Sequence, residues 1–172
     1  MPFAFGHLIG AWIAGKAYER ITKKKIKHYT WFFLLFGSIL PDIDFLIDWT
    51  LGTEVHRTFS HSLLFIVGIS FLVYIVFRYL KNKDAQQFAI ALGAGIFIHI
   101  ALDMISTLGV PLFWPNLAHI SYTSIQYINP ADVSMFIGEK DILIKEIKSA
   151  VFDMGLGTVW IFYLWFKKKI TF

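Results

Sequence analysis

Five apolar segments occupy most of the chain, and they constrain its fold more than any other feature. They cover residues 3–18, 29–51, 61–80, 86–108 and 149–166. About 20 helical residues cross a hydrocarbon layer of roughly 30 Å, so four segments are long enough to span and the first is marginal. Charged residues make up only 16% of the chain, against roughly 25% in soluble domains. The sequence therefore predicts an all-α, multi-pass membrane bundle of about five helices.

The whole chain, residues 1–172, is expected to form a single membrane-embedded domain with one larger polar segment at about 115–148. The stretch EKDILIKEIKSAVF near the end of that segment is amphipathic. It predicts a helix along the membrane surface, which would either cover a site or anchor the last span. Cysteine is absent, which excludes disulfides and thiolate ligands, so any metal would be bound by His and carboxylate side chains.

The distribution of Lys and Arg predicts the orientation of the bundle. Most of these 16 residues follow the first apolar segment, separate the third from the fourth, or follow the fifth. These places lie on one side of the membrane, which the positive-inside rule makes the cytoplasmic side. We therefore expect an N-out, C-in protein of the inner (cytoplasmic) membrane. Its basic character is accounted for by topology and anionic lipid, and no nucleic acid is expected as a partner.

The His and Asp residues inside the apolar segments all fall near the opposite, outer surface. An isolated charged side chain in hydrocarbon costs roughly 2.5–3.5 kcal/mol on insertion scales, so several of them together need mutual compensation. A divalent cation provides it, because it binds both imidazole and carboxylate. The sequence predicts a metal centre on the extracytoplasmic side. The candidate ligands are His7, Asp42, Asp44, His56, His61, His99 and Asp103.

Helical spacing supports this interpretation in the fourth segment. Ala91, Gly95, His99 and Asp103 recur every four residues, so they share one face that small residues mark as packed. In the second segment, Asp42 and Asp44 point to different faces of a regular helix. A local break at Pro41 would bring them to the same side, so both stay candidates.

Further roles follow for neighbouring residues in the outer region. Asp48 could orient a ligating His, Arg57 could bind phosphate, and Ser60 could cap the third apolar helix. The candidate ligands could also serve without a metal: His99 and Asp103 as a hydrogen-bonded pair between helices, His7 as a packing residue, and His56 and His61 as interfacial loop residues. His119, Glu146 and Asp153 lie on the same side and could complete a site.

Four sequence blocks occur in a fixed order between about residues 5 and 115. They are an early His followed by Gly (His7, Gly10), LPDID at 40–44, HRTFSHS at 56–62, and HIALD at 99–103, which continues to GVPLFWP. With these blocks the chain resembles the membrane-bound, metal-dependent hydrolases of bacteria and archaea. That family is distantly similar to zinc-dependent phospholipases C and fungal single-strand nucleases. The resemblance implies that His99 and Asp103 correspond to a helical metal-binding HxxxD pair in those enzymes.

The reaction that this resemblance implies is hydrolysis of a phosphoester. One to three ions would polarise a phosphoryl oxygen and activate water, and Asp42 or Asp44 could bridge two of them. Zinc is the first expectation, and manganese or iron also suit these ligands. A site at the outer membrane surface favours a phospholipid or another lipid-linked phosphoester as substrate. Two alternatives stay open: an ion or small-solute transporter, and a noncatalytic membrane protein that a metal stabilises.

Overall fold

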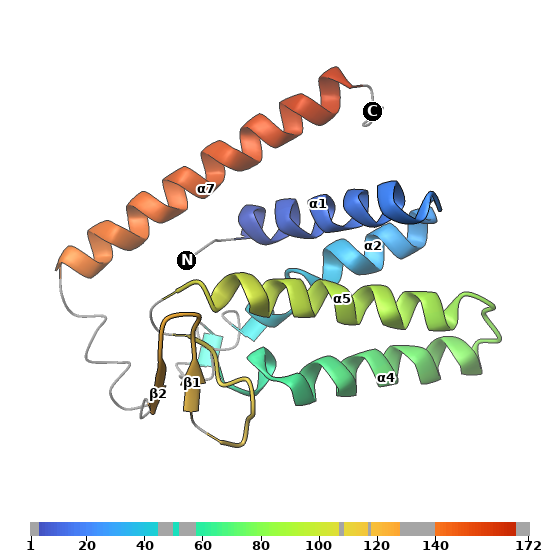
Figure 1. Ribbon diagram of the computed structural model, residues 1–172, viewed down its shortest axis with the longest axis horizontal. Helices are drawn as coiled ribbons and strands as arrows, with labels where there is room; N and C mark the ends of the chain where they lie inside the picture. Colours follow the sequence, from blue (N-terminus) through green and yellow to red (C-terminus); the bar gives the residue numbers. More distant parts are fainter. Residues whose placement is uncertain are drawn as a thin grey trace.

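The computed structural model describes residues 4–44, 50–51, 58–106, 109–116, 118–127 and 140–167. Within these ranges the chain forms five α-helices, two 3₁₀ turns and one antiparallel hairpin (Figure 1). The helices are α1 (Ala4–Thr22), α2 (His28–Gly37), α4 (Leu63–Tyr79), α5 (Ala85–Asp103) and α7 (Lys140–Phe166). The turns are η1 (Pro41–Ile43) and η2 (Phe59–His61), and the strands are β1 (Ala118–Ile120) and β2 (Ile125–Tyr127). The predicted helical fold is confirmed, whereas the sequence patterns did not predict the hairpin.

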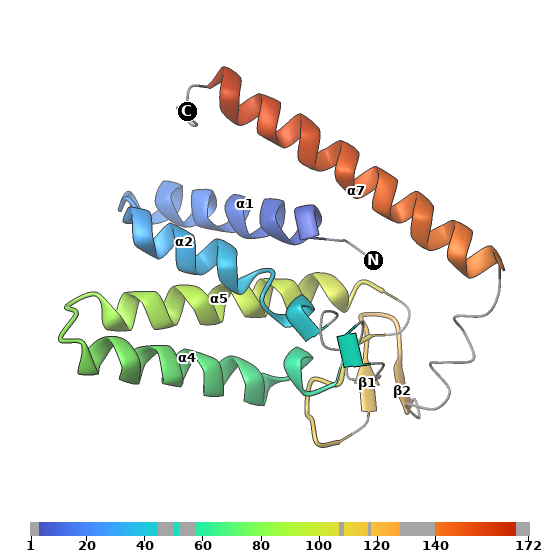
Figure 2. The ribbon, with the colours of Figure 1, turned by 180° about the vertical axis from the view of Figure 1, so that it is seen from behind.

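Helix α5 lies at the centre of the bundle, between α4 on one side and α1 with α2 on the other (Figures 1 and 2). Its Leu92, Ile96 and Ile100 form the main hydrophobic core together with Val110. The face that carries Ala91, Gly95, His99 and Asp103 is buried, as the spacing of small residues predicted. The two residues of chemical interest on this helix therefore point into protein.

Two glycines allow α2 and α5 to approach each other closely. A Cβ on Gly37 would collide with the backbone carbonyl of Leu92, and a Cβ on Gly95 with the carbonyl of Leu34. Only glycine leaves room for this backbone contact. The contact places the C-terminal end of α2, and the residues that follow it, beside His99.

The second apolar segment does not form one helix over 29–51, because its regular bonding stops at Pro41. Proline has no N–H to donate to the carbonyl of Gly37, so α2 ends and the chain tightens into η1. Asp44 follows η1 directly and is buried, while Asp42 within the turn is partly buried. The break at Pro41 brings both carboxylates to the same end of the bundle.

Helix α4 begins with a serine cap, at a different residue from the one expected. The Ser62 hydroxyl accepts a hydrogen bond from the N–H of Phe65 at 3.2 Å, so Ser62 is the N-cap. The prediction that Ser60 caps this helix was wrong, because Ser60 lies one turn earlier in η2. Its hydroxyl instead contacts Asp44 and His61.

The hairpin closes the same end of the bundle. Its strands pair Ala118 with Tyr127 and Ile120 with Ile125. The N–H of Val110 donates to the carbonyl of Ile120 at 3.0 Å, which ties the hairpin to the segment that follows α5. In the same segment, the carbonyl of Leu112 accepts a hydrogen bond from the N–H of Leu63 at the start of α4. The segment therefore joins the hairpin to both α5 and α4.

Helix α7 packs on α1 along one side of the bundle (Figure 1). It runs without interruption through the amphipathic stretch and the last apolar segment, which the sequence patterns had separated. The carboxylate of Asp153 accepts hydrogen bonds from the N–H groups of Phe5 and Gly6 at 3.0 and 2.6 Å. It thereby caps the first turn of α1, the turn that carries His7.

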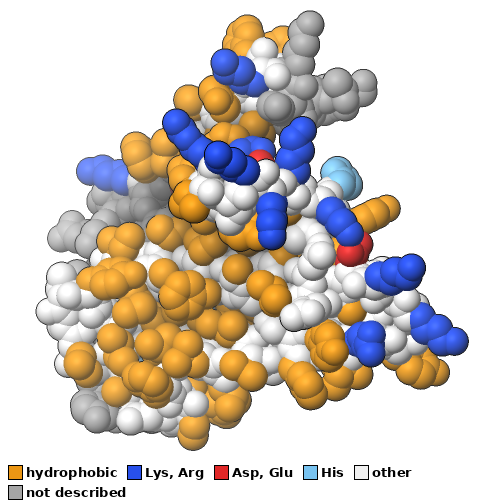
Figure 3. Space-filling view, turned by 45° about the vertical axis from the view of Figure 1, so that its right-hand side comes forward, with side chains coloured by type: hydrophobic (Ala, Val, Ile, Leu, Met, Phe, Trp, Pro, Cys, Tyr) orange, Lys and Arg blue, Asp and Glu red, His pale blue; other side chains and the backbone are white. Residues whose placement is uncertain are grey.

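Apolar side chains are exposed over much of the described surface. No residue of α4 is buried, and its Val67 and Phe71 are 69% and 60% exposed. By length and composition, α5 is the one described helix able to cross a membrane, whereas α4 and residues 150–166 are apolar but shorter. Lys and Arg side chains gather at the end of the bundle that holds the α1–α2 and α4–α5 links (Figure 3). The described candidate ligands lie at the other end, whereas His28 and Asp84 lie beside the lysines.

Candidate metal centre

Six of the candidate ligands predicted from the sequence meet at one end of the bundle. Figure 2 shows that η1 and η2 lie where α5 ends and α1 begins. The residues come from α1, η1 and the position after it, η2 and α5: His7, Asp42, Asp44, His61, His99 and Asp103. Asp48, His56 and Arg57 lie outside the described residues. The N-terminal and C-terminal ends of separate helices thus supply one shared cluster.

Four ligand atoms form the centre of the cluster, and all lie within 4.8 Å of one another. The Nε2 atoms of His61 and His99 are 3.2 Å apart. Asp103 Oδ2 lies 3.3 Å from the first of them and 3.6 Å from the second. Asp42 Oδ1 lies 3.5 Å from His99 Nε2 and 3.9 Å from His61 Nε2. This is a compact set of two nitrogens and two oxygens.

The backbone carbonyl of Ser38, the residue that follows α2, fixes the tautomer of His99. Its Nδ1 lies 2.8 Å from the carbonyl oxygen of Ser38. A carbonyl can only accept, so Nδ1 carries the proton. The neutral imidazole then presents its Nε2 lone pair to the cluster, which is the form that binds metals.

The tautomer of His61 is fixed by a relay of two side chains. Ser60 Oγ donates its only proton to Asp44 Oδ2 at 2.5 Å, so toward His61 it can only accept. His61 Nδ1 lies 2.9 Å from that oxygen and therefore carries the proton. Its Nε2 lone pair also faces the cluster. Asp44 thus acts on the imidazole through Ser60, on the side away from the other three residues.

The cluster consequently concentrates acceptor atoms, and this is the feature that a metal would explain. Two lone pairs face each other beside two carboxylates, which gives the four residues a charge of −2 when the imidazoles are neutral. A proton on one Nε2 would relieve the contact but offset only one of those two charges. A divalent cation would offset both.

The spacing of the four atoms also suits a small divalent ion. Ligands about 2.0–2.1 Å from a tetrahedral zinc ion lie roughly 3.3 Å apart. The two nitrogens, and each nitrogen with each carboxylate oxygen, are 3.2–3.9 Å apart. Asp42, His61, His99 and Asp103 therefore fit a metal with mixed imidazole and carboxylate ligands, and they do not identify which metal it is.

His7 adds a third imidazole beside this group. Its ring stacks on that of His99, with centroids 3.8 Å apart and planes 20° from parallel. Its Nε2 lies 3.5 Å from Asp103 Oδ1, the oxygen that the other two imidazoles do not use. The Asp103 carboxylate therefore faces imidazoles on both sides. Such a carboxylate could bridge two ions, or His7 could hold it in place for one.

Burial differs sharply within the cluster. The side chains of His7, His61, His99 and Asp103 are at most 2% exposed, whereas that of Asp42 is 24% exposed. The exposed side of Asp42 lies in η1, beside the partly exposed Ile43. Asp42 is therefore the most exposed member of the cluster in the described part of the chain.

Three supporting residues were missed or misassigned from the sequence. The Ser38 carbonyl gave no signal, because a backbone contact leaves no side-chain pattern. Ser60 was assigned to a helix cap instead of to His61. Asp153, taken as a residue that could complete the site, instead holds the first turn of α1. His119 lies on β1, and the side chain of Glu146 is outside the described part.

The fold and the cluster define a class of protein: a helical bundle with a candidate metal site buried at one end. The chain belongs to the YdjM inner membrane protein family, whose model matches residues 1–170. It is therefore an inner membrane protein, as the sequence predicted. No curated protein and no solved structure matches the chain. The family description names a location and no reaction, so the resemblance to metal-dependent hydrolases stays a prediction.

Proposed function

We propose that this protein is a multi-pass membrane hydrolase that uses a bound divalent metal to cleave a phosphoester of a lipid or lipid-linked substrate. In this proposal the five apolar segments lie in the membrane, and the cluster faces the extracytoplasmic side. The observation that carries the proposal is the pair of Nε2 lone pairs, 3.2 Å apart and flanked by two carboxylates. Neutral imidazole and carboxylate are ligands that divalent metals such as zinc bind together.

The side chains divide into ligands and residues that hold the ligands. Asp42, His61, His99 and Asp103 would bind the metal. The Ser38 carbonyl and the Ser60 hydroxyl, the latter held by Asp44, keep both imidazoles in the binding tautomer. When bound, the metal would polarise a phosphoryl oxygen and lower the pKa of a water molecule enough to make it a nucleophile at neutral pH.

The position of the cluster at one end of the bundle, and the partial exposure of Asp42, favour a substrate that arrives from the membrane surface. The cluster lies at the end of the bundle opposite the lysine-rich links, and its partly exposed member is Asp42 in η1. Ile43 and Phe59, on the two turns that carry cluster residues, are 41% and 43% exposed. An apolar rim around a polar centre suits an amphiphile whose phosphate enters while its chain stays in lipid. A phospholipid or a lipid-linked phosphate has this chemistry.

Elemental analysis of the purified protein tests the metal. We expect wild type to retain about one equivalent or more of zinc, manganese or iron. His99→Ala should lose it because a ligand is gone, and Asp44→Ala should retain less because His61 is no longer held. His28→Ala is the matched control, since His28 is exposed and lies at the start of α2, away from the cluster. Equal metal content in all four proteins would contradict the site.

Activity is tested with the same four proteins on a panel of phospholipids and lipid-linked phosphates. The proposal predicts metal-dependent release of a phosphate-containing product by wild type and His28→Ala, and loss of at least about a hundredfold in His99→Ala. Bound metal without turnover on any substrate would instead support a noncatalytic, metal-stabilised protein. Accumulation of a solute in proteoliposomes without product would support a transporter.

A further inference from the structure

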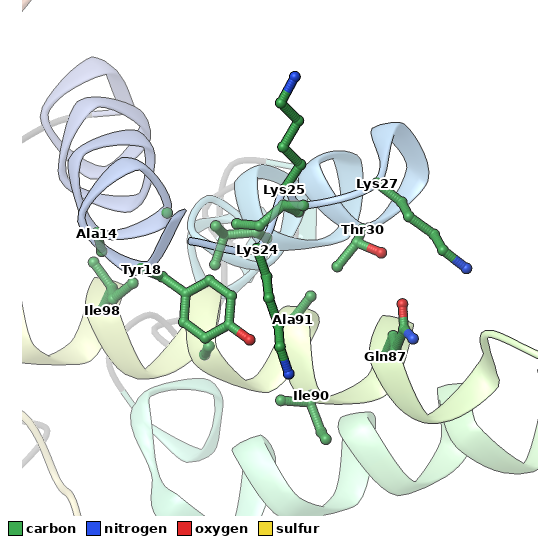
Figure 4. Close-up of a pocket in the computed structure, with 14 residues that line it drawn as sticks. Ala14, Tyr18, Lys24, Lys25, Lys27, Thr30, Gln87, Ile90, Ala91 and Ile98 are labelled. Carbon is green, nitrogen blue, oxygen red and sulfur yellow. The ribbon is translucent and has the colours of Figure 1, made fainter. Parts of the chain in front are cut away.

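A cavity of about 500 Å³ lies between α1, α2 and α5, and it runs from the lysine-rich end of the bundle to Ile98 (Figure 4). The link between α1 and α2 contributes Lys24, Lys25 and Lys27 to its lining. Most other lining residues are apolar, among them Ala14, Tyr18, Ile90, Ala94 and Ile98. We propose that this cavity binds an anionic phospholipid of the leaflet at that end, with the phosphate at the lysines and an acyl chain along the apolar wall.

The lysines leave a positive charge at the cavity that other described side chains do not neutralise. Lys27 Nζ is 2.5 Å from Asp84 Oδ1, and nearby Lys16 is paired with Glu19 at 2.7 Å. Within the described part of the chain, no carboxylate pairs with Lys24 or Lys25. Two unneutralised ammonium groups favour an anionic ligand, and a phosphate offers the oxygens they prefer as acceptors.

The link that carries these lysines is held in place by the end of α1. Glu19 Oε1 accepts hydrogen bonds from the N–H of Ile26 at 2.9 Å and from Trp31 Nε1 at 3.4 Å. Figure 4 shows the Lys24 side chain running past Tyr18 toward Ile90, whereas Lys25 points outward. Lys24 is therefore positioned to meet a headgroup, and Lys25 adds to the positive potential beside it.

The apolar wall is long enough to hold part of an acyl chain. Ile90, Ala94 and Ile98 recur every four residues on α5, which gives a strip about 12 Å long. Ile90 is 63% exposed, so the strip opens to the surroundings of the bundle. Free phosphate would fill only the basic end and leave this strip bare. The combination of a basic end and an apolar strip therefore favours a lipid over a soluble anion.

Native mass spectrometry of the full-length, detergent-purified protein tests this proposal. We expect phosphatidylglycerol to bind at least about tenfold more tightly than phosphatidylcholine with the same acyl chains. The variant K24Q/K25Q should lose this preference. The matched control K81Q/K83Q removes two exposed lysines from the α4–α5 link at the same end and should keep it. Equal binding of the two lipids by wild type, or equal loss in both variants, would overturn the proposal.

Two further experiments distinguish a bound lipid from a bound free anion. Ala94→Leu adds bulk to the apolar strip and should weaken phosphatidylglycerol binding several-fold while the lysines stay in place. Glycerol phosphate, which carries the headgroup charge without acyl chains, should not displace the lipid at equal concentration. Displacement by glycerol phosphate would show an anion site and overturn the lipid assignment. All these variants should keep their metal, so this test does not depend on the proposed hydrolase function.

Discussion

The hydroxyl proton of Ser60 decides which nitrogen of His61 faces the cluster. Because that proton is donated to Asp44, Ser60 Oγ is left to accept from His61 Nδ1 at 2.9 Å. The ligand nitrogen of His61 is thus set by a residue that would never touch the metal. Residues of this kind typically change metal affinity by 10- to 100-fold when they are replaced.

Ser60→Ala should therefore weaken metal binding by roughly 10- to 100-fold with little change in the fold. Without the hydroxyl, the imidazole of His61 can turn or change tautomer. Competition with a chelator of known affinity measures the change. Ser70→Ala is the control, because Ser70 is a serine of α4 whose buried hydroxyl has no hydrogen-bond partner among the described residues. Unchanged affinity in Ser60→Ala would contradict the relay.

Among the helices, the crossing of α2 and α5 brings Ser38 to His99. It depends on Gly37 and Gly95, where a Cβ would meet backbone of the opposite helix. Backbone cannot move aside as a flexible side chain can, so the helices themselves would have to separate. The geometry of the candidate site and the packing of the core therefore both depend on Gly37 and Gly95.

Gly95→Ala should destabilise the protein by about 1–3 kcal/mol, which is typical of overpacking in a close contact. It should also weaken metal binding, because His99 would move away from Ser38. Gly68→Ala is the matched control: Gly68 lies in α4, and a Cβ there meets nothing within 4 Å. Alanine favours helix more than glycine does, so this control should be neutral or slightly stabilising. Thermal unfolding in detergent compares the two variants, and equal melting temperatures would contradict the crossing.

The contact between α7 and α1 supports the turn that carries His7. Asp153→Ala removes the acceptor for the N–H groups of Phe5 and Gly6. We therefore expect it to lower the free energy of unfolding by about 1 kcal/mol. Asp84→Ala, which breaks an exposed ion pair with Lys27, should cost less. Chemical or thermal unfolding measures both. A larger effect for Asp84→Ala would argue against the cap.

The parts of this arrangement that could be predicted from the sequence are those with a local pattern. The four-residue spacing from Ala91 to Asp103 predicted a buried helical face, and Pro41 predicted where the second segment would break. The Ser38 carbonyl and the relay from Asp44 to His61 depend on how helices pack, and no spacing in the sequence encodes that. The extent of α7 was missed because an amphipathic start and an apolar end gave two different local patterns to one continuous helix.

For the molecule as a whole, the separation of the cluster from most Lys and Arg residues predicts its orientation in the membrane. The chain contains no cysteine, so single cysteines can be introduced without a background. Tyr122→Cys, in the hairpin turn at the cluster end, should react with an impermeant thiol reagent applied outside the cell. Asn82→Cys, in the α4–α5 link, should react only after the membrane is permeabilised. The reverse pattern would place the site on the cytoplasmic side and contradict the proposed orientation.

The extended X-ray absorption fine structure of the retained metal tests whether the two facing imidazoles bind it, because this measurement reports which atoms surround the ion. For zinc, we expect a shell of imidazole nitrogen and carboxylate oxygen at about 2.0–2.2 Å. His61→Ala and His99→Ala should each reduce the imidazole contribution in any metal they still hold. A shell of oxygen alone in the wild-type protein would show that the two facing imidazoles do not bind the metal, and would contradict the account.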